Sequence, residues 1–377
     1  MRKLSLILAT LVAALFLYGC GGTDTEKPTA SQNAPAAQAP AAAQAPAAPA
    51  APAAGDEAPA AQPAPAAEPV VYAFVSKDIN NPYMQKAFEG FEAACAEMGV
   101  KALYKGPEQA TPESQIEVIN QLVAQKVNAI VIAANDADAL RPALTAAMKR
   151  GIAVVSTDSA VNKESRLVHV QQADPELIGR QLIQAAAEMV NMDGGLAVLS
   201  ATAQATNQNL WIDWMKKELA ENPEKYAKTP LIKIAYGDDD PTKSTSETQA
   251  LLKNEEIGVI IAPTTVGMLA SGKYLQDNKS KVILTGLGLP SEMAPFIEDG
   301  TCPWMFLWNP VDLGYLSAYV AEAAAKGQLT GAAGETFSAG KMGQKSVTPA
   351  ADGGTEVMLG PPYKFDKENI AQWKAIY

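Results

Sequence analysis

The pattern that sets the architecture is first clear at residues 129–138, Ala-Ile-Val-Ile-Ala-Ala-Asn-Asp-Ala-Asp. An apolar run of strand length leads directly into amides and carboxylates. Uninterrupted Val, Ile and Leu are typical of strands buried on both faces, as in a parallel sheet. Similar runs predict further strands at 70–75, 152–156, 196–199, 231–236, 259–262, 282–285 and 304–308.

Amphipathic segments with readable ends lie between these runs. Asp174-Pro175 and Asp240-Pro241 each place a capping carboxylate before a proline at the first helical position. Pro223 ends the helix that begins near Asn207. The alternation of strand and helix predicts a doubly wound α/β fold. Because residues 68–377 are too many for one compact core, we expect two lobes.

The loops that follow the strands are rich in amides, carboxylates and hydroxyls. In open α/β sheets, ligands bind beyond the carboxyl ends of the strands. Tyr83, Trp211 and Trp308 lie close to these loops in the sequence, and aromatic faces cover the C–H side of a sugar ring. The combination predicts a sugar or polyol pocket. The loops are 76–81, 135–138, 157–159, 201–208, 263–265, 286–290 and 308–312.

The sequence offers little support for catalysis or a cofactor. No phosphate-binding loop, nucleophile elbow or dinucleotide fingerprint follows a strand, and no Cys and His spacing resembles a metal site. The single His169 falls in an expected strand, where a structural role is favoured. Asp136, Asp138 and Asp158 leave open a glycosidase pair. The run 238–240 fits a solvated turn better than a Ca²⁺ loop. We therefore expect a binding protein with no cofactor and no metal, rather than an enzyme.

Several of these loops resemble a known family. Residues 76–83 resemble the first-strand loop of periplasmic sugar-binding proteins of the ribose-binding type. Four further segments are similar to the rhamnose-binding proteins of ABC importers, which are cousins of the autoinducer-2-binding proteins. The resemblance runs from about Val70 to the end of the chain. The segments are 205–211, 263–267, 284–288 and 307–314.

The resemblance implies two Rossmann-like lobes joined by three hinge crossings, near Gln171, Asn309 and Val347. The N-terminal lobe would then comprise residues 68–171 and 309–346, and the C-terminal lobe residues 172–308 and 347–377. Cys95 and Cys302 would fall in different lobes, so we expect no bridge between them.

The resemblance also carries over to six positions where autoinducer-2 binders contact ligand. Asn207 stands where those proteins have Asp, and Thr265 where they have Ala. An amide both donates and accepts hydrogen bonds whereas a carboxylate only accepts, so the change favours a methylpentose such as rhamnose. Asn80, Asn135 and Asp136 come from the polar loops and Trp308 would supply a stacking face. The six positions are Lys77, Asp158, Asn207, Gln208, Pro263 and Thr265.

The start of the chain resembles an export signal. Arg2 and Lys3 precede an apolar run, and Leu17-Tyr18-Gly19-Cys20 resembles a lipobox. We expect residues 1–19 to be a lipoprotein signal peptide, Cys20 to carry lipid, and residues 20–67 to include a disordered Ala/Pro tether. An uncleaved membrane anchor is the alternative, although the run is short for a span.

These expectations combine into a lipid-anchored solute-binding protein of a sugar ABC importer, in the cell envelope or periplasm, that binds its sugar by closure of the two lobes. The net charge of −11 argues against a nucleic-acid partner. The expected partners are a monosaccharide, an ABC permease and its ATPase, and a membrane surface, with the protein itself a monomer. A sensor of autoinducer-2 or of a sugar signal, and a sugar-processing enzyme, remain as alternatives.

Overall fold

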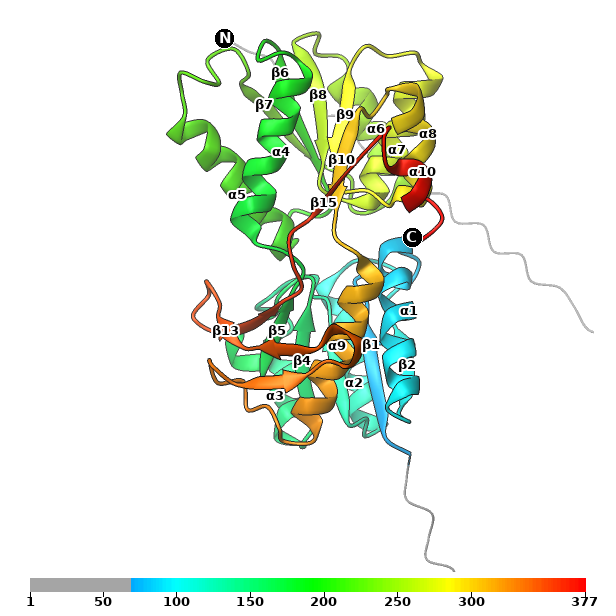
Figure 1. The fold of residues 1–377 in the computed structure, drawn as a ribbon, viewed down its shortest axis with the longest axis vertical. Helices are drawn as coiled ribbons and strands as arrows, with labels where there is room; N and C mark the ends of the chain where they lie inside the picture. Colours follow the sequence, from blue (N-terminus) through cyan, green and yellow to red (C-terminus); the bar gives the residue numbers. More distant parts are fainter. Residues whose placement is uncertain (1–68) are drawn as a thin grey trace, which may run out of the picture. The chain divides into compact units, whose positions relative to one another are not determined.

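The protein is described by a computed structural model over residues 69–377, all within one compact unit of the chain. The expected signal peptide, lipidated Cys20 and Ala/Pro tether lie outside the described residues. The described chain forms two α/β lobes, each built on a mainly parallel sheet (Figure 1). None of the helices in this region is both long and apolar enough to cross a membrane.

The sheet of the first lobe has seven strands in the order β13-β14-β5-β4-β3-β1-β2. Six of them are parallel, and only β13 runs antiparallel to its neighbour. The strands are β1 (Val71–Val75), β2 (Lys101–Lys105), β3 (Ala129–Ile132), β4 (Ala153–Thr157), β5 (Val168–Gln171), β13 (Thr348–Pro349) and β14 (Thr355–Met358).

Helices cover both faces of this sheet, which explains its continuous apolar runs. Tyr72 and Phe74 of β1 belong to the core that includes helices α1 and α9, whereas Ala73 and Val75 belong to the core under α2 and α3. A strand buried on both faces favours apolar side chains at successive positions. The helices are α1 (Pro82–Glu97), α2 (Pro112–Ala124), α3 (Arg141–Lys149) and α9 (Pro310–Ala325), with a short η1 turn (Lys163–Ser165).

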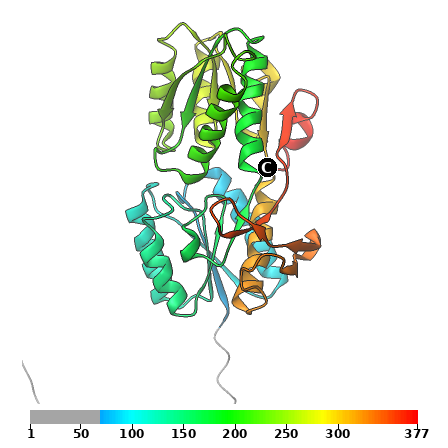
Figure 2. The same cartoon turned by 90° about the vertical axis from the view of Figure 1, so that its left-hand side faces the viewer.

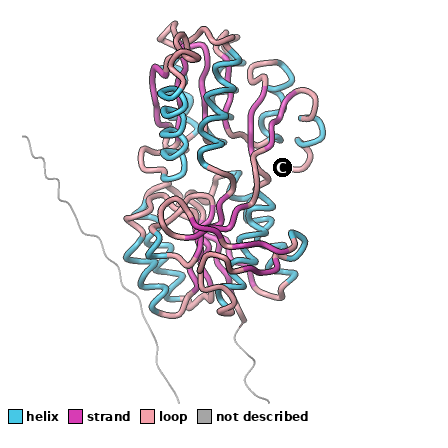
Figure 3. Tube along the Cα trace, turned by 60° about the vertical axis from the view of Figure 1, so that its left-hand side comes forward, coloured by secondary structure: helices cyan, strands magenta, loops and turns pink. Residues whose placement is uncertain are grey.

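The second lobe has a parallel four-stranded sheet in the order β7-β6-β8-β9, with helices on its faces (Figure 3). A bridge between Leu287 and Phe306 joins the end of β9 to β10, and β15 pairs antiparallel with β10. The strands are β6 (Gly195–Ser200), β7 (Leu231–Tyr236), β8 (Ile257–Ala262), β9 (Ile283–Gly286), β10 (Trp304–Leu307) and β15 (Tyr363–Asp366). The helices are α4 (Pro175–Met189), α5 (Thr206–Glu221), α6 (Pro241–Leu251), α7 (Thr265–Asp277), α8 (Pro290–Asp299) and α10 (Ile370–Trp373).

The predicted fold class, two doubly wound α/β lobes, is confirmed. The predicted helix starts are found as well: Asp174 accepts from the backbone N–H groups of Glu176 and Leu177, and Asp240 accepts from that of Lys243. A strand at 101–105 was not predicted, because its charged ends and mixed interior suit the edge of a sheet rather than its centre.

The chain passes between the lobes three times. It leaves the first sheet after Gln171 and returns to it with α9, after β10 ends at Leu307. The third crossing was expected near Val347, and this is wrong. β14 pairs in parallel with β5, with Val357 opposite Val170, so the first lobe extends to Met358.

The first lobe extends to Met358 because β5 would otherwise present an unpaired sheet edge. A hairpin over Gly353, whose φ is +77°, turns β13 into β14 and covers that edge. Only β15 and α10 of the C-terminal residues lie on the second lobe, as the red end of the chain shows (Figure 2). A short antiparallel pair, β11 (Thr336–Ser338) and β12 (Gln344–Ser346), flanks a second turn, η2 (Gly340–Met342), earlier in this segment.

Helix α9 returns to pack closely along α1. A Cβ atom at Gly314 would lie 1.6 Å from the backbone oxygen of Ala87, and one at Gly90 would lie 1.8 Å from that of Val311. Only residues without a side chain permit this approach. Cys95 of α1 and Cys302 of the second lobe are both buried, and both are free thiols.

We predict that Gly314→Ala lowers the free energy of unfolding by about 3 kcal/mol, because the added methyl forces the two helices apart. Urea denaturation followed by circular dichroism measures this loss. Gly360→Ala is the matched control, since no atom lies within 4 Å of the added methyl there. Equal stability of the two variants would contradict the close packing of α1 and α9.

Candidate functional site

Loops from both lobes surround a cavity of about 40 Å³ at the carboxyl ends of the strands. Seven of the ten residues predicted from the sequence line it: Lys77, Asp158, Asn207, Gln208, Pro263, Thr265 and Trp308. The first two follow β1 and β4, and Trp308 follows β10 at a crossing. The other four lie near the N-termini of α5 and α7, as the rule for open parallel sheets requires.

A buried ion pair lies at the centre of the cavity. Lys77 Nζ is 3.2 Å from Asp158 Oδ2, and the two side chains are 8% and 5% exposed. Asn207, from the second lobe, contacts both charges. Its Oδ1 accepts from Lys77 Nζ at 3.1 Å and its Nδ2 donates to Asp158 Oδ2 at 3.1 Å. One amide therefore satisfies a cation and an anion of the other lobe.

Two aromatic residues extend the network from Asp158. The Tyr83 hydroxyl donates to Asp158 Oδ1 at 3.1 Å and accepts from Trp308 Nε1 at 2.6 Å. Burial and the nearby Asp158 carboxylate raise the pKa of Tyr83 well above its usual value, so the hydroxyl keeps its proton at physiological pH. Asp158 itself has a φ of +59°, a left-handed conformation that Asp adopts more readily than most residues.

The second lobe presents donors to the cavity. Gln208 Oε1 accepts from Ser200 Oγ and from the backbone N–H of Ala201, both at 2.9 Å. This fixes the orientation of the amide and leaves its N–H₂ group without a protein acceptor within residues 69–377. Thr265 stands at the start of α7, and its hydroxyl also has no partner in the described chain.

The remaining wall of the cavity is aromatic and aliphatic. The Tyr83 and Trp308 rings are nearly perpendicular with centroids 6.2 Å apart, and those of Trp211 and Trp308 are 5.9 Å apart. Met84, Leu287 and Leu307 complete this wall and are buried. The cavity thus has a polar side and an apolar side, which suits a ligand that carries both hydroxyls and an apolar surface.

Three residues predicted for the site lie elsewhere. Asn135 is buried, but its amide donates to the backbone oxygen of Lys77 at 2.9 Å, so it supports the loop rather than lining the cavity. Asn80 and Asp136 line a larger groove next to the cavity. Asp136 Oδ1 accepts from the N–H groups of Asp138 and Ala139, which stabilises a turn.

The candidate catalytic groups raised by the sequence are also placed elsewhere. Asp136 and Asp138 do not line the cavity with Asp158, and Asp138 accepts from Asn162 at 2.7 Å. His169 lies between Ser156 Oγ and Gln171 Oε1, and burial lowers its pKa to about 3. It is therefore neutral at physiological pH and contributes to the packing of the first sheet.

The acidic run 238–240, read from the sequence as a solvated turn, has three separate roles. Asp238 pairs with Lys243 on the surface, and Asp240 caps α6. Asp239 instead lines the cavity and accepts from the Thr264 hydroxyl, which the sequence interpretation missed. The available signal was its position just after β7, at the same sheet edge as the predicted loops.

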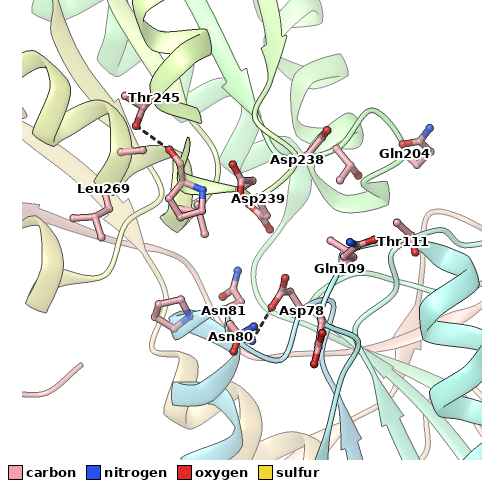
Figure 4. Close-up of a pocket in the computed structure, with 18 of the residues that line it drawn as sticks. Asp78, Asn80, Asn81, Gln109, Thr111, Gln204, Asp238, Asp239, Thr245 and Leu269 are labelled. Atoms are coloured by element: carbon pink, nitrogen blue, oxygen red, sulfur yellow. Dashed lines mark hydrogen bonds between the residues drawn. The ribbon is translucent and has the colours of Figure 1, made fainter. Parts of the chain in front are cut away.

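A groove of about 1260 Å³ adjoins the cavity, and Asn81 and Asp239 line both. Asp78, Asn80 and Asn81 lie across it from Asp238 and Asp239 (Figure 4). Nine carboxylates and a single amine, that of Lys273, line this groove. Such an acidic surface disfavours the approach of anionic solutes and leaves neutral ones unaffected.

The Asp239 carboxyl group makes stability depend on pH. Burial raises its pKa above the usual 3.8, and the carboxylates of Asp78 and Asp158 raise it further, against the opposing effects of the Thr264 hydrogen bond and of Lys77. The folded protein therefore binds this proton more tightly than the unfolded chain. Stability contributed in this way is present at low pH and is lost as pH rises through the raised pKa.

We predict that Asp239→Asn raises the thermal midpoint at pH 7 and that the gain shrinks towards pH 4. Asn keeps the oxygen that accepts from Thr264 and tolerates the φ of +52° at this position. Differential scanning fluorimetry across this pH range measures the effect. Asp238→Asn, at an exposed neighbour, serves as the control, and an identical profile in both variants would contradict the assignment to Asp239.

Comparison with known proteins supports this description of the fold. An ABC transporter solute-binding protein from Clostridium phytofermentas, solved with bound L-rhamnose, is 46% identical, with a TM-score of 0.79 over 83% of this chain and 100% of that one. A sugar ABC transporter protein from Actinomyces odontolyticus is 38% identical, with a TM-score of 0.63 over 81% and 97%. LsrB from Clostridium saccharobutylicum, in complex with AI-2, shares the fold at 24% identity and a TM-score of 0.75 over 81% and 99%.

The family model for the periplasmic binding protein domain matches residues 72–329, which run from β1 to the end of α9 and leave out β11 to β15. It also includes every residue predicted for the ligand site. Together with the two relatives above 30% identity, this match shows that the chain belongs to the periplasmic binding protein family.

Proposed function

We propose that the protein is the solute-binding component of an ABC importer and that its ligand is a methylpentose, L-rhamnose or a close relative. The observation that carries the proposal is the cavity: a buried ion pair and free amide and hydroxyl donors face an aromatic and aliphatic wall. The 46% identity to a protein solved with L-rhamnose supports this choice of ligand.

The polar side of the cavity suits the hydroxyls of a sugar. Asp158 supplies charged acceptor oxygens, while Lys77, the Gln208 N–H₂ group and the Thr265 hydroxyl supply donors. Hydrogen bonds to charged groups are the stronger ones, so Asp158 and Lys77 contribute most to affinity. The apolar side, with Met84, Leu287 and Leu307, suits a methyl group better than a hydroxymethyl group.

Ligand entry requires the lobes to move apart. The cavity of about 40 Å³ is far below the roughly 300 to 1,000 Å³ of typical ligand pockets. Asn207 contacts Lys77 and Asp158 directly, and sugar hydroxyls would replace it as the partner of both charges. A ligand that contacts both lobes only when they are together shifts the population towards the closed form.

The position of the protein in the cell follows from the expected start of the chain. In this proposal Cys20 carries lipid and holds the protein on a membrane surface, and the Ala/Pro segment gives it the reach to meet the permease, which the ATPase drives. Reception of autoinducer-2 is the competing function, because four of the six carried-over positions match those binders and only Asn207 and Thr265 differ.

We predict that L-rhamnose binds more tightly than L-lyxose or L-mannose in isothermal titration calorimetry. L-lyxose lacks the methyl carbon, and the loss of about 0.8 kcal/mol per buried carbon corresponds to a few-fold weaker binding. L-mannose adds a hydroxyl that the apolar wall cannot satisfy, which costs about 1 to 3 kcal/mol. Tighter binding of autoinducer-2 than of all three sugars would favour the competing function.

We predict that Asp158→Asn weakens the binding of L-rhamnose about 10- to 100-fold, because a hydrogen bond to a charged group is worth about 1.5 to 3 kcal/mol. Asp136→Asn is the matched control: Asp136 follows a neighbouring strand but lies outside the cavity, and Asn keeps the oxygen that its turn requires. The assignment of the site fails if both variants bind the sugar as tightly as the unaltered protein.

A further inference from the structure

The indole N–H group of Trp211 is buried and has no hydrogen-bond partner in the described chain. The residue is 2% exposed, so bulk solvent does not reach this donor. Trp308, the neighbouring indole, differs in this respect because its Nε1 donates to the Tyr83 hydroxyl at 2.6 Å. A buried donor without an acceptor costs about 1 to 3 kcal/mol, so such a group calls for an explanation.

The position of Trp211 in the fold suggests an explanation for its unpaired indole N–H group. Six buried side-chain atoms within residues 69–377 lack a partner, and Trp211 Nε1 alone belongs to a residue that lines the cavity. Trp211 follows Asn207 and Gln208 by four and three positions on α5. Residues at this spacing share one face of a helix, so the three side chains belong to the same surface.

None of the acceptors that line the cavity bonds Trp211 Nε1. Both Asp158 oxygens accept from side chains, Oδ1 from Tyr83 and Oδ2 from Asn207. Gln208 Oε1 accepts from Ser200 and Ala201. The Trp211 N–H group therefore has no acceptor within the described chain. The cavity contains two further donors without a protein acceptor among residues 69–377, the Gln208 N–H₂ group and the Thr265 hydroxyl.

We propose that Trp211 Nε1–H donates a hydrogen bond to one oxygen of the bound sugar and so selects for an oxygen at that position. The inference rests on the proposed function and adds to it a specific contact. An indole N–H donates and cannot accept, so a ligand with a methylene group in place of that oxygen leaves the donor unsatisfied. Sites built to bond a polar group reject analogues that lack it.

Nuclear magnetic resonance of the protein with ¹⁵N-labelled indole groups tests this contact directly. The chain has five tryptophans, so the spectrum contains five indole N–H signals, which Trp211→Phe and Trp214→Phe help to assign. On addition of L-rhamnose we expect the Trp211 signal to move downfield, because its N–H group gains a hydrogen bond. The Trp214 signal stays in place, because Trp214 is on the same helix but outside the cavity.

Calorimetry with a variant and a series of analogues tests the same contact energetically. We expect Trp211→Phe to weaken L-rhamnose binding about ten-fold, as for the loss of one hydrogen bond. With the monodeoxy analogues of L-rhamnose, one analogue should bind Trp211→Phe and the unaltered protein equally, because it lacks the oxygen in question. Trp214→Phe should bind every sugar as the unaltered protein does.

The outcomes separate this inference from the proposed function. If L-rhamnose binds but the Trp211 signal does not move, the hydrogen bond is absent. The same holds if Trp211→Phe weakens the binding of every analogue equally. Either result contradicts the Trp211 contact and leaves the proposed function standing. If neither L-rhamnose nor a related methylpentose binds, both fall. Should Trp211→Phe fail to fold, the spectrum of the unaltered protein still decides between contact and no contact.

Discussion

The structure depends on two opposite charges, Lys77 and Asp158, held together out of contact with solvent. Removing charges from water carries a large penalty, and a buried pair is tolerated only when further hydrogen bonds satisfy it. The first lobe supplies one such bond through Tyr83, and the second lobe supplies the rest through Asn207. The contact between the lobes and the chemistry of the ligand site are therefore the same set of bonds.

The fold places these groups without special local geometry beyond the conformation of Asp158. Parallel strands end at one edge of each sheet, and the crossings of the chain bring the two edges towards a common cavity. The close packing of α9 on α1 through Gly90 and Gly314 fixes the returning segment that carries Trp308 at its start. Trp308 in turn orients Tyr83, so this crossing contributes directly to the site.

Much of this arrangement could be predicted from the sequence, because local signals determine it. Apolar runs with polar residues at their ends gave eight strands close to their observed bounds, and the two Asp-Pro caps marked helix starts. The pairing of β14 with β5 was missed, because it joins segments far apart in the chain and leaves no local pattern. For the same reason the sequence did not show that Asp239 lines the cavity while Asp238 and Asp240 do not. Nor did it show that Asn135 supports the Lys77 loop instead of lining the cavity.

The most direct test of the central claim is a crystal structure of the protein grown with L-rhamnose. The account predicts sugar hydroxyls within hydrogen-bond distance of Asp158 and Lys77, with the direct bonds from these two residues to Asn207 replaced by contacts to the sugar. A sugar bound in the acidic groove instead, with the bonds among Lys77, Asp158 and Asn207 unchanged, would contradict it.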